Sequence, residues 1–92
     1  MGFKVFVHKK VADKLEDLEG KSRGRVKKAL KELSVDPYKK RAGADIKKLS
    51  GTAGREDAHR IRVGDHRIVY SIQGKKVYAT VLFKRGRDYR EL

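Results

Sequence analysis

A chain of 92 residues is long enough for one domain with a small core and too short for a second domain. It contains no cysteine, which excludes a disulfide framework, a thiolate metal site and a cysteine nucleophile. Its 25 Lys and Arg against 12 Asp and Glu give a net charge of +13 at neutral pH. Such a field favours nucleic acid as a partner, because each neutralised phosphate releases counterions. Residues 1–46 carry 13 basic and 7 acidic side chains and residues 47–92 carry 12 and 5, so the charge is not confined to a tail.

Localisation signals and metal motifs are not found. The opening MGFKVFVHKK has too short an apolar stretch for a signal peptide, and no apolar run approaches the roughly 20 residues that span a bilayer. We therefore expect a cytoplasmic protein that does not contact membranes. His8, His59 and His66 lack metal-ligand spacing, so we expect neither a metal nor another cofactor.

The first half of the chain predicts a strand and a helical hairpin. Residues 3–7 alternate as a half-buried strand does. From Lys9 the apolar residues fall at helical spacing, which predicts a helix ending at Gly20 in a left-handed conformation. Ser22 is the expected N-cap of a second helix, which stops before Asp36-Pro37. Residues 38–57 are predicted to be mostly loop, with room for a short structured piece at 46–49.

The last third predicts a three-stranded meander. Two-residue turns, Gly64-Asp65 and Gly74-Lys75, separate runs rich in β-branched residues at 59–63, 66–72 and 76–83. The expected fold is a single α+β domain over residues 1–92: an N-terminal strand, a helical hairpin, then a three-stranded antiparallel meander, with both helices on one face of the sheet.

Centring the two turns on their glycines assigns each meander residue to a face. One face is free of charge and is the expected core: Ile61, Val63, Ile68, Tyr70, Ile72, Val77, Ala79, Val81 and Phe83. The opposite, open face receives Arg60, Arg62, Arg67, Val69, Ser71, Tyr78, Thr80, Leu82 and Lys84.

The open face places Arg62 directly opposite Arg67, with Arg60 and Lys84 nearby and no acidic neighbour. Facing like charges destabilise an antiparallel pair, so selection for stability alone would avoid them. Long side chains that splay into water are the simplest explanation of one such pair. Four converging cations favour an anion site instead, because arginine offers a rigid fork of donors that suits phosphate.

The tail adds further candidates. Strict alternation aims Arg85 toward the core, so it can join the cluster only if the strand ends or bulges near Gly86. Tyr89 is either a ring on which a base stacks or a tail aromatic packed on the sheet. We also expect a set of basic residues to bind RNA: Lys47, Lys48, Lys84, Arg87 and Arg90.

The segments HRIRVGDHRIVYSI and KVYATVLFKRGRDY, preceded by KKLSGT, resemble the RelE/ParE superfamily of toxins from toxin-antitoxin modules, particularly the RelE branch. The resemblance covers nearly the whole chain. It implies a ribosome-dependent endoribonuclease that cleaves mRNA in the A site, with a ribosome, an mRNA and an antitoxin as partners. The antitoxin would have an acidic toxin-wrapping segment. Residue by residue, the resemblance assigns the catalytic roles to Arg60, Arg62, Arg67, Arg85 and Tyr89.

Departures from the family pattern leave two points open. The basic catalytic pair is often lysine in this family, whereas this chain has arginine, which stays protonated above pH 12 and does not accept protons. Tyr89 follows Arg85 more closely than the corresponding tyrosine does in the best-known bacterial members. Two alternative functions remain: a ParE-like toxin that inhibits gyrase without cutting RNA, and a basic module that binds RNA or ribosomes without catalysis.

Overall fold

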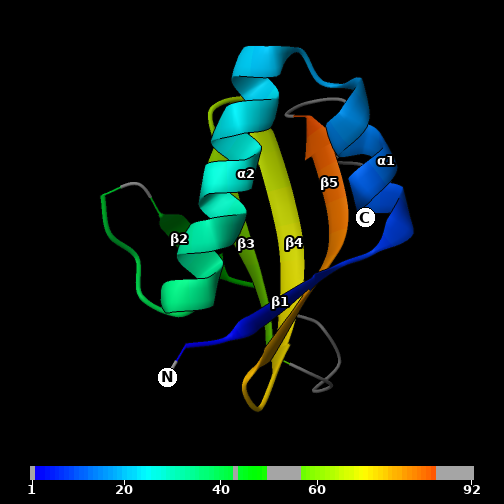
Figure 1. Ribbon diagram of the computed structural model, residues 1–92. Helices are drawn as coiled ribbons and strands as arrows, with labels where there is room; N and C mark the ends of the chain where they lie inside the picture. The colour runs from blue at the N-terminus through cyan, green and yellow to red at the C-terminus, as the bar shows by residue number, and fades with distance from the viewer. Residues whose placement is uncertain (1, 43, 50–56, 85–92) are drawn as a thin grey trace.

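The computed structural model describes residues 2–42, 44–49 and 57–84. Its elements are two helices and five strands, in the order β1 (Lys4–Val7), α1 (Lys9–Asp17), α2 (Gly20–Val35), β2 (Asp45–Lys48), β3 (Asp57–Val63), β4 (His66–Gln73) and β5 (Lys76–Lys84) (Figure 1). The α+β class, the helical hairpin and the meander of β3, β4 and β5 confirm the sequence-based prediction. The strand β2 adds a fifth strand to the predicted four. It overlaps the short structured piece that was allowed for at 46–49 within a segment expected to be mostly loop.

The five strands form one sheet in the order β1-β5-β4-β3-β2. The three C-terminal strands pair antiparallel, as the two turns predict, and Gly64 and Gly74 adopt φ values of 60° and 61°. Glycine reaches this left-handed region at no steric cost, which explains its place in both tight turns. The first strand, β1, lies parallel to β5 at one edge, and β2 closes the other edge.

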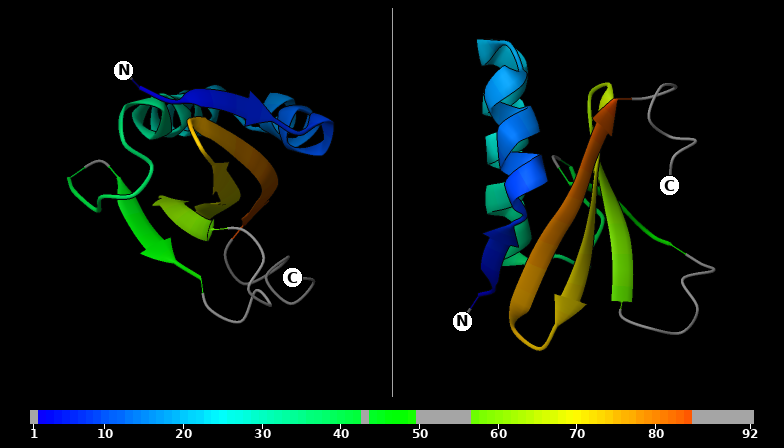
Figure 2. Two further views of the ribbon diagram at one scale, coloured as in Figure 1. Left: turned by 90° about the horizontal axis from the view of Figure 1, so that it is seen from below. Right: turned by 90° about the vertical axis from the view of Figure 1, so that its right-hand side faces the viewer.

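Both helices cover the same face of the sheet, and among the described residues no helix lies on the other face (Figure 2). The core lies between these layers. Val11 and Leu15 of α1 and Val26, Ala29 and Leu33 of α2 supply its helical side. The sheet contributes buried residues at alternating positions: Ile46, Ile61, Ile68, Tyr70, Ile72, Val77, Ala79 and Leu82. Burial of this apolar surface is the main stabilising term for so small a domain.

The helix boundaries differ from the prediction at one junction. The first helix ends at Asp17, where the Leu18 N–H donates to the Leu15 carbonyl, and the second helix begins already at Gly20. Gly20 is therefore the first residue of α2 and not a left-handed C-terminus, and Ser22 lies inside the helix and not at its N-cap. The extended residues between the helices allow a tighter connection than the sequence pattern indicated. The predicted stop at Asp36-Pro37 is confirmed.

A β-bulge changes the predicted faces at the end of β5. Val69 pairs with Val81 but Tyr70 pairs with Ala79, so Thr80 is one extra residue in β5. Extra residues of this kind reverse the alternation beyond them. Leu82 consequently pairs with Ile68 and enters the core, whereas Val81 pairs with Val69 on the open side, which corrects the assignment of both. Phe83 pairs with Arg67 and is nevertheless buried, with 2% of its surface exposed, so its predicted burial is confirmed. Lys84 likewise pairs with His66 on the helix side, so its predicted place on the open face was wrong.

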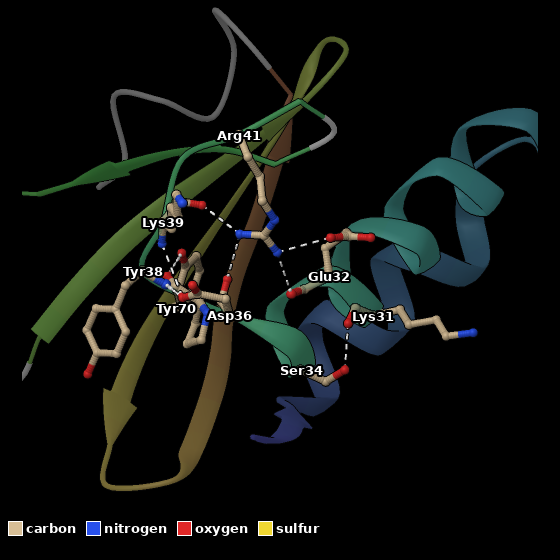
Figure 3. Close-up of polar contacts among 9 residues, drawn as sticks. Lys31, Glu32, Ser34, Asp36, Tyr38, Lys39, Arg41 and Tyr70 are labelled. Carbon is tan, nitrogen blue, oxygen red and sulfur yellow. Dashed lines mark hydrogen bonds and ion pairs between the residues drawn. The ribbon is translucent and has the colours of Figure 1, made fainter. Parts of the chain in front are cut away.

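A polar network braces the chain where it leaves α2 (Figure 3). The Arg41 guanidinium donates to the carbonyl oxygens of Glu32, Asp36 and Lys39 and to the Glu32 carboxylate at 3.0 Å. The Tyr70 hydroxyl donates to the Pro37 carbonyl at 2.7 Å, and burial raises the pKa of this hydroxyl well above its ordinary value. These contacts fix the path from α2 toward β2 and hence the register of β2 on the sheet.

A candidate nucleic-acid interface on the open face

The face of the sheet that carries no helix presents a cationic end, built by cross-strand neighbours. Asp45 of β2, Arg62 of β3, Arg67 of β4 and Phe83 of β5 form one row across the sheet. The adjacent row contains Lys47, Arg60, Val69 and Val81. We call Lys47, Arg60, Arg62 and Arg67 the cationic cluster. Its members are three of the predicted catalytic arginines and Lys47, which was predicted to bind RNA, and the register brings all four together.

Two like-charged pairs face each other within the cationic cluster. Arg62 is the cross-strand partner of Arg67, as predicted, and Lys47 is the partner of Arg60. The second pair was not foreseen, because it depends on β2. Like charges directly opposite each other destabilise a sheet, so this arrangement has a local cost in stability. A bound anion between the side chains would relieve it.

One acidic side chain lies beside the cluster, contrary to the expectation of none. The Asp45 carboxylate is 3.1 Å from Nε of Arg62 and 3.8 Å from Nζ of Lys40. This carboxylate offsets part of the repulsion between Arg62 and Arg67. Sequence reasoning missed it because Asp45 belongs to a segment predicted as loop, and its pairing with β3 joins residues far apart in the chain.

The Arg67 guanidinium is positioned by its own hairpin. It donates to the carbonyl oxygens of Gly64 and His66, each at 3.1 Å. Arg60 is half-buried and Arg62 is exposed. Fixed guanidinium groups of this kind present planar donors to an incoming anion with little loss of side-chain entropy.

A cleft adjoins the cluster on the side of α2. It encloses about 390 Å³ and is lined by Arg25 and Lys28 of α2 and by Asp45, Arg62 and Gly64 of the sheet, among others. The helix itself carries six basic residues and one acidic residue: Lys21, Arg23, Arg25, Lys27, Lys28, Lys31 and Glu32. Arg25 and Lys28 are functional candidates that the sequence reasoning did not single out. The signal that could have found them is the excess of basic residues on α2.

The remaining predicted site residues lie elsewhere. Lys48 alternates with Lys47 and is paired with His59 of β3, so it belongs to the helix side of the sheet. Lys84 belongs to the same side. Four predicted residues, Arg85, Arg87, Tyr89 and Arg90, lie outside the described part of the chain.

Within residues 2–42, 44–49 and 57–84, no three His, Asp or Glu side chains gather closely enough to hold a metal ion. Neither α1 nor α2 has the length and apolar character of a membrane-spanning helix. The open face offers positioned cationic donors. Such donors bind phosphate oxygens and stabilise negative charge that develops on them.

Comparison with known proteins identifies this architecture. Residues 5–89 match the family model described as ParE toxin of the type II toxin-antitoxin system parDE. The RelE1 protein of Methanocaldococcus jannaschii, whose name describes it as a toxin, is 32% identical over 72 residues, which cover 78% of this chain and 76% of that protein.

Solved structures agree. The archaeal RelE-RelB complex from Pyrococcus horikoshii contains a chain that is 32% identical, with a TM-score of 0.81 over 95% of this chain and 99% of the other. The RelB-RelE antitoxin-toxin complex of Methanococcus jannaschii matches with a TM-score of 0.73 at 24% identity, covering 95% and 98% of the two chains. A mutant of the E. coli toxin RelE in its free state shares the fold at 20% identity, with a TM-score of 0.70 over 97% and 90%.

The fold and the cationic open face thus define a toxin of the type II toxin-antitoxin class, and the chain belongs to the RelE/ParE superfamily. Within that superfamily its relatives place it in the RelE branch.

Proposed function

We propose that this protein is a ribosome-dependent endoribonuclease that cleaves mRNA in the ribosomal A site. The observation that carries the proposal is the cationic cluster, in which Arg62 faces Arg67 across β3 and β4 and Arg60 faces Lys47 across β2 and β3. These repulsive pairs have a cost in stability in the free protein. A phosphate backbone would bind them and relieve their repulsion.

The proposed reaction is a transesterification within the RNA. The ribose 2′-hydroxyl gives up its proton to solvent, and the 2′-oxygen bonds to the adjacent phosphorus. The bond from phosphorus to the 5′-oxygen then breaks, and that oxygen takes up a proton, which leaves a 2′,3′-cyclic phosphate and a 5′-hydroxyl. Arg60, Arg62 and Arg67 are assigned to the phosphoryl oxygens as donors and not as bases, because arginine remains protonated.

The magnitude of catalysis follows from these roles. One well-aimed donor in such a site contributes about 2.7 to 4 kcal/mol to the transition state. Orientation of the RNA by the ribosome supplies the rest of the rate enhancement. We therefore expect feeble activity on free RNA and strong activity on translating ribosomes. Arg85 and Tyr89 remain proposed members of the site.

The same surface suits a neutralising partner. The Pyrococcus and Methanococcus relatives are seen in complex with RelB. By analogy we propose a cognate antitoxin whose acidic segment wraps this chain and covers the cationic cluster, since complementary charge speeds association. Both partners and the ribosome meet in the cytoplasm, which we propose as the site of action.

The test is cell-free translation of a defined mRNA with the toxin added, followed by mapping of the mRNA ends. The proposal expects cuts at fixed codon positions that require ribosomes and that disappear in Arg67→Ala. Inhibition of translation without cuts would contradict it and would favour the non-catalytic binding module.

A gyrase-inhibiting role is the second candidate, because the matching family model is described by the ParE toxins. A DNA supercoiling assay with purified gyrase separates the two. Inhibition of supercoiling together with intact mRNA would support this candidate.

A further inference from the structure

A pair of aromatic rings stands on the open face, away from the cationic cluster. Phe6 of β1 and Tyr78 of β5 are direct cross-strand partners. Their ring centroids are 5.3 Å apart and their planes differ by 17°, which is a stacked geometry. Phe6 is 41% exposed, so its ring is accessible to a ligand.

The ring pair and the cationic cluster lie on the same side of the sheet. Tyr78 is paired with Ser71 of β4, and Ser71 is four residues along that strand from Arg67. Four residues of strand span roughly 13 Å. The positions between the two features are uncharged, since Val69, Val81 and the bulged Thr80 occupy them.

Lysines flank the ring pair on its far side. Lys4 of β1 and Lys76 of β5 are exposed cross-strand partners. Each lies two residues before a ring of the pair in its strand, and therefore on the same face of the sheet. The open face therefore has cations at both ends, a neutral strip between them and an exposed ring beside the second pair. Surfaces that bind single-stranded RNA combine these features, because phosphates need cations and unstacked bases need aromatic faces.

We infer that Phe6 and Tyr78 form a base-stacking subsite for single-stranded RNA whose backbone is held by the cationic cluster. The inference rests on the proposed function in that it takes RNA as the ligand. It adds a second contact with the RNA, away from the arginines. One of the two rings belongs to β1, an element on which the proposed reaction does not depend. The flanking lysines favour RNA over an apolar protein segment, which would leave their charges unmatched.

The experiment measures fluorescence anisotropy with two labelled oligoadenylates, of two and of ten nucleotides. The short RNA cannot bridge the roughly 13 Å between the cationic cluster and the rings, whereas the long RNA can. Base stacking on one ring accounts for a roughly 5- to 100-fold change in affinity. Phe6→Ala should therefore weaken binding of the ten-nucleotide RNA by roughly that factor and weaken binding of the two-nucleotide RNA much less.

Three comparisons isolate the ring. Phe6→Trp should retain tight binding, because it keeps an aromatic face, and Phe6→Leu should lose it, although it keeps an apolar side chain. Val35→Ala, at an apolar residue of α2 that is 64% exposed, is the matched control and should bind both RNAs as the parent does. The salt dependence of binding should be the same in Phe6→Ala as in the parent, since no phosphate contact is removed. Thermal melts should show these variants folded.

Several results would overturn the inference. These are unchanged binding of the long RNA by Phe6→Ala, equal binding by Phe6→Leu and the parent, or equal weakening for both RNA lengths. Loss of affinity for the antitoxin without loss for RNA would assign the rings to a protein partner instead. A failure of the proposed function looks different: the parent would not cut mRNA on ribosomes, yet its affinity for the long RNA would still depend on Phe6.

Discussion

Replacing Asp45 by Asn tests how the cationic cluster is balanced. The carboxylate is 3.1 Å from Arg62, and the two side chains are 33% and 53% exposed. Ion pairs this exposed contribute about 0.2 to 1 kcal/mol to folding. The substitution also leaves Arg62 and Arg67 facing each other without compensation. We expect the free energy of unfolding to fall by about 1 kcal/mol or less, which a denaturant titration can measure.

The same substitution should strengthen RNA binding. In the parent, a phosphate bound by Arg62 would lie close to the Asp45 carboxylate. Two unit charges about 4 Å apart in water repel by about 1 kcal/mol. Removing that repulsion corresponds to about a fivefold gain in affinity. The gain should shrink as salt screens the charges. Anisotropy with a ten-nucleotide RNA at low and high salt is the assay.

Asp13→Asn is the matched control, because it makes the same charge change on the exposed surface of α1. It should raise RNA affinity much less than Asp45→Asn. Equal gains in the two variants would mean that only net charge matters. Weaker binding by Asp45→Asn would mean that the carboxylate is needed to orient Arg62, and the reasoning about balance would be wrong.

Three further outcomes are expected. Arg67→Ala should abolish mRNA cleavage while shifting the free energy of unfolding by no more than about 1 kcal/mol, since it removes a phosphate donor and a repulsive pair together. A much lower melting temperature would show that Arg67 is structural. Arg67→Lys separates the effect of the charge from that of the planar guanidinium. A log-log plot of RNA affinity against salt should fall steeply, and a flat plot would reject the electrostatic account. Tyr70→Phe should cost about 1 to 3 kcal/mol, because the buried Pro37 carbonyl loses its donor. Because burial raises the pKa of Tyr70 above its ordinary value of 10.0, the parent should lose stability as the pH rises above about 10, where only the unfolded chain ionises this group, and the variant should lose less.

Local sequence patterns were sufficient to predict much of the fold. Glycine turns and β-branched runs determined the register of β3 on β4, including the pairing of Arg62 with Arg67. This worked because a two-residue turn fixes the pairing of the strands it joins. The same construction failed at the end of β5, where Val81, Leu82 and Phe83 are all apolar and alternation cannot tell which of them faces the core. The bulge at Thr80 settles the choice through contacts with β4 and the helices.

Long-range pairing limited the prediction of the site. The strand β2 is four residues long and lies between segments with no periodic pattern. Its position depends on the network around Arg41 and Tyr70, whose partners are up to 33 residues apart in the chain. Without β2, neither the Asp45 ion pair nor the Lys47 and Arg60 pair could be foreseen. The arginines could be predicted as a group, but their electrostatic neighbours could not.

Lys47→Glu tests whether the charges of the open face favour the stability of the fold or the binding of an anion. Lys47 faces Arg60 directly, so the substitution turns a repulsive cross-strand pair into an attractive one. Opposite charges at such positions contribute roughly 0.2 to 1 kcal/mol, and the repulsion is removed as well. The variant should therefore melt at a higher temperature than the parent, yet bind RNA more weakly and cleave mRNA more slowly. Lys48→Glu makes the same charge change one residue along, on the helix side of the sheet, and should reduce RNA binding less. A stabilised Lys47→Glu variant with undiminished RNA binding and cleavage would show that the cationic cluster does not hold the substrate.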